Sequence, residues 1–89
     1  MTDSFEPELS FPCEYPVRVI GKDEDNFAAF VMEVVSHHVP DLAADMYTIR
    51  PSSKGKYISV AVTFIAESRA QVDGLYHELG SHPRVLVAL

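Results

Sequence analysis

The sequence predicts a single α+β domain of the ferredoxin-like class: a βαββαβ sandwich whose four-stranded antiparallel sheet carries two helices on one face. One observation is the order of the periodic patterns, which runs strand, helix, strand, strand, helix, strand. Another is a glycine-containing turn between the two middle strands, which indicates a hairpin. The third is length, because 89 residues with 47% hydrophobic side chains can bury one core and leave little room for an enclosed ligand pocket.

The chain begins with an acidic segment and continues into the first strand. Residues 1–10 show no periodicity and are expected to form a flexible acidic tail, which leaves 11–89 as the single domain. Residues 14–21 alternate as a strand with one buried face does, and Gly21 is expected to end that strand. The core-facing side chains of this strand are expected to be Tyr15, Val17 and Val19.

A first helix is expected from about Asp25 to His38. The acidic run at 23–25 suits a helix N-terminus through capping and the helix dipole. Pro40 stops the helix, because proline disfavours helical geometry in the residue before it. The apolar residues at helical spacing are Phe27, Phe30, Val31 and Val34.

The middle of the chain predicts a hairpin. Residues 46–51 and 56–66 each alternate, and a Ser-Ser-Lys-Gly sequence with turn chemistry separates them. The longer run presents one fully apolar face, which we expect to point into the core. That face consists of Ile58, Val60, Val62 and Phe64.

A second helix and a short last strand complete the fold. Ser68 and Gln71 have the spacing of a capping box, which predicts the start of the helix. Gly80 is expected just beyond the end of that helix, where a left-handed residue commonly terminates it. Residues 84–89 are apolar and predict the final strand.

Because both helices are expected to pack on one face of the sheet, the other face is left uncovered. Antiparallel sheets tolerate such exposure, and a semi-apolar face of this kind is typical of a contact surface. The strand alternation assigns to this open face Arg18, Ile20, Thr48, Arg50, Tyr57, Ser59, Ala61, Thr63 and Ile65.

Charge and cysteine content restrict the function classes. The net charge of -6 argues against nucleic-acid binding, which depends on Lys and Arg neutralising phosphates. Cys13 is the only cysteine, so no disulfide can form within the chain. The first residues lack the pattern of a secretory leader, and no apolar run is long enough to span a membrane. We therefore expect a cytoplasmic protein with no membrane association.

The turn at 50–57 is the most distinctive stretch. It concentrates three cations and two serine hydroxyls, and such groups together with turn amides can bind a phosphate or a carboxylate. The alternative is an ordinary solvated hairpin whose serines and glycine satisfy the backbone. The residues alone leave both interpretations open. The candidate anion- or partner-binding residues are Arg50, Ser52, Ser53, Lys54, Lys56 and Tyr57.

Nothing in the spacing indicates catalysis, a metal or a cofactor, and we expect none of them. Acylphosphatases share this size and topology, but three acidic residues follow Gly21 where those enzymes need a phosphate cradle. His37 and His38 are adjacent, so a helix would point them about 100° apart. Cys13 has no basic partner nearby in the sequence and is expected to be an inert thiol.

Several motifs together suggest a known family. Phe11-Pro12-Cys13 opens the domain, Leu75-Tyr76 lies near its close, and Pro51-Ser52-Ser53-Lys54-Gly55-Lys56-Tyr57 stands at its centre. In these segments the chain resembles the YbeD-like family of small bacterial proteins, also named lipoate regulatory proteins. The resemblance implies a ferredoxin-like fold similar to regulatory ACT domains and no established activity. It favours a functional role for the 50–57 turn, because binding residues often lie on loops.

Two functions are consistent with these observations. The first is a non-enzymatic regulatory or adaptor domain that binds a protein partner or another copy of itself through the open sheet face and the 50–57 hairpin. The second is a sensor of a small anionic metabolite in the manner of ACT domains, which the family name links to lipoate metabolism.

Overall fold

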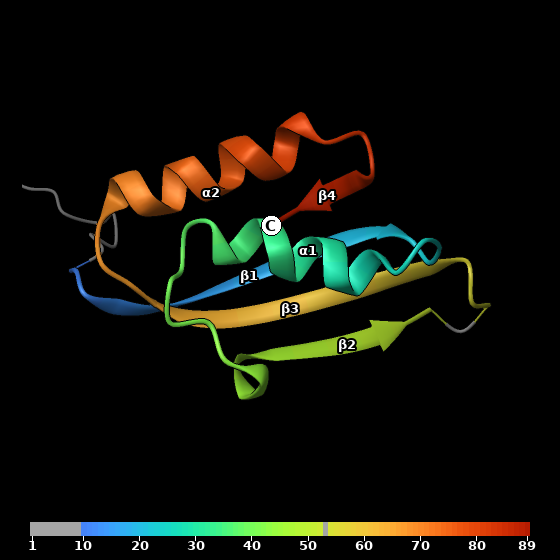
Figure 1. Cartoon of the computed structure of the whole chain (residues 1–89), viewed down its shortest axis with the longest axis horizontal. Helices are drawn as coiled ribbons and strands as arrows, with labels where there is room; N and C mark the ends of the chain where they lie inside the picture. Colours follow the sequence, from blue (N-terminus) through green and yellow to red (C-terminus); the bar gives the residue numbers. More distant parts are fainter. Residues whose placement is uncertain (1–9, 53) are drawn as a thin grey trace, which may run out of the picture.

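The computed structural model describes residues 10–52 and 54–89 (Figure 1). The expected tail at 1–10 therefore lies outside the described residues except for Ser10, and the candidate residue Ser53 also lies outside them. The helices and strands follow the expected order. They are β1 (Cys13–Lys22), α1 (Phe27–Ser36), the short 3-10 helix η1 (Ala44–Met46), β2 (Tyr47–Pro51), β3 (Tyr57–Ala66), α2 (Arg69–Ser81) and β4 (Val85–Ala88).

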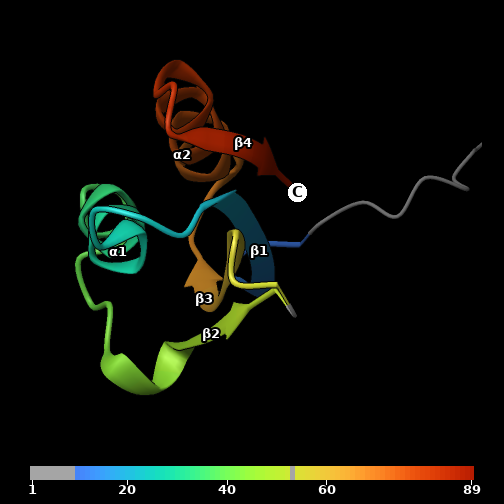
Figure 2. The same cartoon turned by 90° about the vertical axis from the view of Figure 1, so that its right-hand side faces the viewer.

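The four strands form one sheet in the order β2-β3-β1-β4, and all neighbouring strands are antiparallel. Both helices lie on one side of this sheet, as the end-on view in Figure 2 shows. The ferredoxin-like βαββαβ fold is thereby confirmed. In the part of the chain that the structure describes, neither helix has the length and apolar composition needed to cross a membrane.

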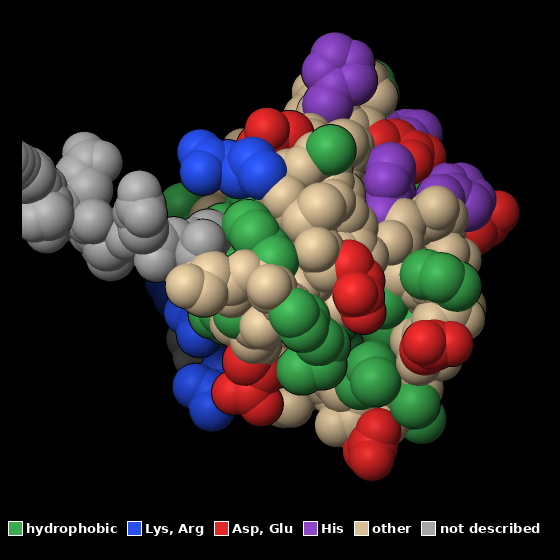
Figure 3. All heavy atoms as spheres, turned by 90° about the vertical axis from the view of Figure 1, so that its left-hand side faces the viewer, with side chains coloured by type: hydrophobic (Ala, Val, Ile, Leu, Met, Phe, Trp, Pro, Cys, Tyr) green, Lys and Arg blue, Asp and Glu red, His purple; other side chains and the backbone are tan. Residues whose placement is uncertain are grey.

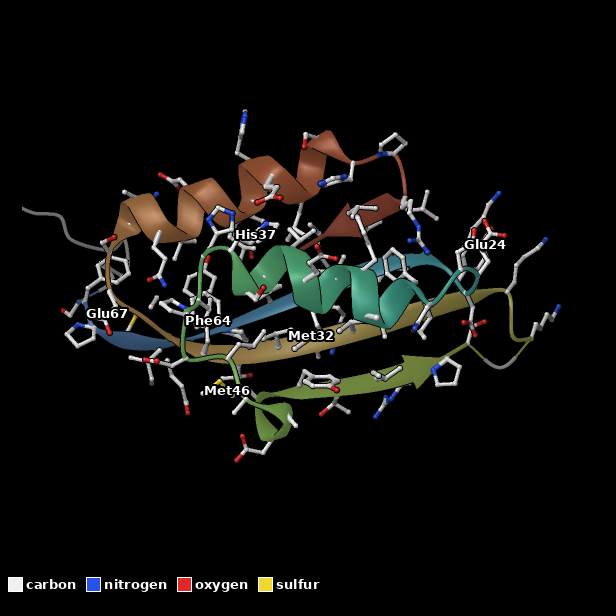
Figure 4. The ribbon with its side chains drawn as sticks, in the orientation of Figure 1. Glu24, Met32, His37, Met46, Phe64 and Glu67 are labelled. Atoms are coloured by element: carbon white, nitrogen blue, oxygen red, sulfur yellow. The ribbon has the colours of Figure 1, made fainter. Side chains whose placement is uncertain are left out.

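Pairing of β1 with β3 forms the centre of the sheet. Ten consecutive residue pairs join the two strands without a bulge, and the valines pair with one another: Val17 with Val62, and Val19 with Val60. All four are at most 2% exposed. Phe64 projects from the same strand face towards the helices (Figure 4), so this face of the sheet is the floor of the core.

The helices cover that floor with their apolar stripes. Tyr15 and Tyr76 pack at the edge of the core, with ring centroids 6.4 Å apart. No polar or charged side chain is buried among the described residues, so hydrophobic contact dominates the interior. The buried helical residues are Phe27, Val31, Val34 and Val35 from α1 and Val72, Leu75 and Leu79 from α2.

The expected start of α1 at Asp25 is wrong, because the helix begins two residues later at Phe27. Asp25 and Asn26 adopt left-handed backbone angles, with φ of 52° and 53°, and Asn26 makes no side-chain cap. Arg84 instead provides hydrogen bonds to the backbone carbonyl groups of this turn. Its guanidinium donates to the carbonyl oxygens of Glu24 and Asp25 at 2.6 and 3.0 Å, and it stacks 4.8 Å from the Phe30 ring centre.

Other boundaries also differ from expectation, and α1 ends at Ser36, two residues before the expected His38. β1 continues past Gly21 to Lys22, because Lys22 still pairs with Tyr57 of β3. Gly80 lies inside α2 and does not terminate it, since the helix ends at Ser81 and Gly80 has no left-handed backbone conformation. The N-terminal cap of α2 is as expected, because the backbone N–H of Gln71 donates to the Ser68 hydroxyl at 3.2 Å.

The tight packing of Gly21 generates a stability prediction. A Cβ at this position would lie 2.5 Å from the Phe27 ring and 2.6 Å from the carbonyl oxygen of Arg84, so Gly21→Ala should destabilise the fold by about 1–3 kcal/mol. Gly80→Ala is the matched control, since nothing lies within 4 Å of its added Cβ and alanine favours a helix by up to about 1 kcal/mol. Urea unfolding monitored by circular dichroism measures both. Equal effects of the two substitutions would contradict this packing.

Candidate functional site

The open face of the sheet brings together side chains from three strands. Alternate residues of β1, β2 and β3 point away from the helices, and the register aligns them in rows across the sheet. In one row Arg18 and Thr48 flank Ala61, and in the next Ile20 and Arg50 flank Ser59.

A shallow depression of about 480 Å³ lies on this face. Ala61 has the smallest side chain in its row, which leaves space between Arg18 on one neighbouring strand and Thr48 on the other. The depression joins the open face to the start of the 50–57 hairpin. It is lined by Arg18, Ile20, Thr48, Arg50, Pro51, Ser52, Tyr57, Ile58, Ser59 and Ala61.

Two arginines give the depression its charge. Arg18 and Arg50 are both exposed, and they stand on opposite sides of β3, one row apart. Strand geometry places their Cα atoms about 12 Å apart. At this separation the guanidinium groups of two extended arginine side chains can both contact the same anion. Neither arginine forms an ion pair with any residue that the structure describes.

The hairpin uses Ser52 to hold its own backbone. The Tyr57 N–H donates to the Ser52 hydroxyl at 3.1 Å, and the Ser52 N–H donates to the Tyr57 carbonyl at 2.8 Å. The Gly55 N–H donates to the Ser52 carbonyl at 3.0 Å, and Gly55 adopts φ of 71°, which favours glycine. Ser52 therefore has a structural role at the rim of the depression.

The candidate residues of the turn separate into two groups. Arg50, Ser52 and Tyr57 line the depression, whereas Lys54 and Lys56 are exposed and are not among its lining residues. The Lys56 carbonyl instead accepts a hydrogen bond from the Asp23 N–H at 3.0 Å, which ties the hairpin to the loop after β1. Strand alternation already assigns Arg50 and Tyr57 to the open face, whereas the contribution of Ser52 depends on the shape of the turn, which alternation does not predict.

The remaining open-face residues extend the surface away from the hairpin. Thr63 and Ile65 line a second hollow with Glu14 and Asp45, and Ala61 borders both hollows. Leu89 pairs with Arg18 through two backbone hydrogen bonds of 3.1 and 2.9 Å and borders a third hollow on this face. The open face is therefore one continuous surface.

Comparison with known proteins establishes the family. A family model described as "Protein of unknown function (DUF493)" matches residues 6–89. The chain belongs to this family. A UPF0250 protein of Chromobacterium violaceum is 38% identical over 89 residues, which is 100% of both chains. A UPF0250 protein of Neisseria gonorrhoeae is 41% identical over 81 residues, which cover 91% of this chain and 89% of the relative. The expected YbeD-like membership is thereby confirmed.

A solved structure supports the same fold. The solution structure of protein HP0495 from H. pylori aligns with a TM-score of 0.70 and covers 98% of this chain and 91% of that chain. Sequence identity between the two is 19%, so the likeness bears on the fold alone. Neither the family description nor the names of the relatives indicate an enzymatic activity.

This member of the family carries a second polar cluster that the sequence analysis missed. The carboxylate of Glu78 on α2 accepts hydrogen bonds from His37 Nδ1 at 3.0 Å and His38 Nε2 at 2.7 Å. His82 Nε2 lies 3.8 Å from the same carboxylate. Figure 4 shows His37 at the end of α1 nearest α2, and Figure 3 shows histidine side chains gathered beside acidic ones. The four-residue spacing of Glu78 and His82 was the available sequence signal.

The cluster links the helices and has no metal-binding geometry. Gln71 Nε2 donates to the His38 carbonyl at 2.7 Å, so α2 binds the turn that follows α1 at two points. No group of three or more histidine, cysteine or acidic residues in the described ranges 10–52 and 54–89 is arranged to hold a metal ion. The hydrogen bonds from His38 and then His37 hold the pKa of Glu78 below its ordinary value of 4.5.

The lowered pKa of Glu78 generates a pH prediction. A carboxyl group with a lower pKa in the folded state stabilises the fold above its unfolded pKa, and this stabilisation is lost as pH falls below 4.5. The stability difference between the wild type and Glu78→Gln should therefore be fully present well above pH 4.5 and should shrink towards pH 3. Urea unfolding at a series of pH values measures it. Asp73→Asn is the control, because Asp73 meets Arg69 at 3.6 Å in an exposed pair. A difference that does not change with pH would contradict the hydrogen bonds from His37 and His38 to Glu78.

Proposed function

We propose that the protein is a cytoplasmic, non-enzymatic regulatory or adaptor domain that binds a protein partner through its open sheet face and the adjoining hairpin. The observation that carries the proposal is the hollow at Ala61, which lies between two exposed arginines without ion-pair partners among the described residues. A fold with so little interior leaves surface contact as its main means of recognition.

The chemistry of the face supports partner binding. Tyr57, Ile65 and Val87 are 40%, 51% and 40% exposed, and strand alternation places all three on the side away from the helices. Exposed aromatic and aliphatic side chains beside arginines are the composition that protein interfaces favour. The net charge of -6 favours a protein over a nucleic acid as the partner.

The first test is affinity capture from the native cytoplasm with matched variants. Ala61→Arg fills the hollow with a bulky cation, and Tyr57→Glu places an acid at its rim. Both should lose a protein that the wild type retains, with at least a tenfold fall in recovery. Arg69→Glu is the control, since Arg69 is 72% exposed on the helical side. Retention of every captured protein by all three variants would refute binding through the open face.

The same depression supports a second candidate, the sensing of a small anionic metabolite in the manner of an ACT domain. Arg18 and Arg50 supply charge, while Ser59, Thr48 and Tyr57 supply hydroxyl groups around a partly apolar floor. A hollow of about 480 Å³ is large enough for a small carboxylate or phosphate.

Amide chemical shifts test the metabolite candidate. Phosphate, lipoate and amino acids are titrated separately to millimolar levels, and binding predicts shifts at Ser52, Ser59 and Ala61 that saturate. Arg50→Gln should weaken the affinity about tenfold, because a hydrogen bond to a charged group is worth about 1.5–3 kcal/mol. The absence of saturable shifts for the whole panel would remove this candidate.

A further inference from the structure

The two ends of the open face carry opposite charge. At the hairpin end, Lys22 lies on β1 opposite Tyr57, and Arg50 lies on β2 opposite Ser59. At the other end, Glu14 lies on β1 opposite Ile65, and Asp45 precedes β2 in η1. All four charged side chains are exposed. None forms an ion pair within the described parts of the chain.

This arrangement is complementary to itself. Consider a two-fold axis that runs parallel to the sheet and perpendicular to the strands, at the row of Ala61. This axis places each strand opposite the same strand of the second copy, with the strand direction reversed. The row of Tyr57 then faces the row of the partner's Ile65, because the two rows are equally far from Ala61 along β3. The same operation brings the cationic end of one copy over the acidic end of the other.

We propose that a second copy of this chain covers the open face, with the two sheets packed face to face and the strands antiparallel. Lys22 meets the partner's Glu14, and Arg50 meets the partner's Asp45. The two hollows centred near Ala61 receive the apolar side chains of the facing sheet. The inference rests on the proposed function, and it identifies the protein partner as the chain itself.

The size of the face fits a reversible dimer. Strands spaced by about 4.8 Å and rising about 3.3 Å per residue give roughly 500 Å² on each copy, or roughly 1,000 Å² in total. That area is at the lower end for specific interfaces. Sheets packed in this way cross at about 30°. Arg18 lies in the row through which the axis passes, so the Arg18 side chains of the two copies lie near each other and their like charges oppose close contact there.

Net charge opposes the association. Each copy carries a charge of -6, so the long-range force between two copies is repulsive. At about 150 mM salt the Debye length is about 8 Å, and contacts within the interface outweigh the distant charges. Dimerisation should therefore strengthen when salt is raised from a low concentration to about 150 mM.

The test reverses the charges at one end of the open face at a time. Lys22→Glu with Arg50→Glu makes both ends acidic, and Glu14→Lys with Asp45→Lys makes both ends basic. Each double variant alone should dimerise at least tenfold more weakly than the wild type, because its facing ends repel. An equimolar mixture of the two should form a heterodimer. The quadruple variant, which restores complementary ends and the net charge of -6, should recover the homodimer.

Sedimentation velocity and native mass spectrometry measure these species, and circular dichroism checks that every variant is folded. A wild type that stays monomeric at high micromolar concentration would overturn the inference, and so would a mixture that forms no heterodimer. Dimers unaffected by either double variant would also refute it. The capture experiment with Ala61→Arg is separate from these outcomes, so binding of a different protein at this face would survive the failure of the dimer.

Discussion

The uninterrupted pairing of β1 with β3 is the constraint on which the rest of the molecule depends. Successive side chains alternate between the two sides of a sheet, so a shift of β1 by one residue against β3 would move Val17 and Val19 out of the core. The same shift would carry Arg18 beneath the helices. One register therefore determines both the hydrophobic floor and the composition of the open face. In the observed register the valines are buried and Arg18 is exposed.

Sequence periodicity predicts the parts of the fold that burial controls. The valines of β1 and β3 and the apolar stripe of α2 lie where the alternation and the helical spacing place them. The start of α1 could not be predicted in the same way. Asp25 and Asn26 adopt left-handed conformations, and Arg84 from the other end of the chain satisfies the carbonyls of this turn. A contact across about sixty residues leaves no local signal in the sequence.

The candidate site shows a similar limit. Arg18, Ser59 and Ala61 were assigned to the open face by alternation, and the structure places them around one depression with Arg50. The cationic turn suggested a cluster on the loop. Yet the Ser52 hydroxyl accepts a backbone hydrogen bond, and Lys54 and Lys56 lie outside the depression. The cationic centre of this surface therefore belongs to the strands, and the turn mainly supports its rim.

The histidine cluster and the two arginines lie on opposite sides of the sheet. The cluster of His37, His38 and Glu78 belongs to the helical layer, whereas Arg18 and Arg50 belong to the open face of the sheet. The sheet separates the two groups. A molecule bound to the open face therefore leaves the histidine cluster uncovered, and the two sides can be occupied without steric competition.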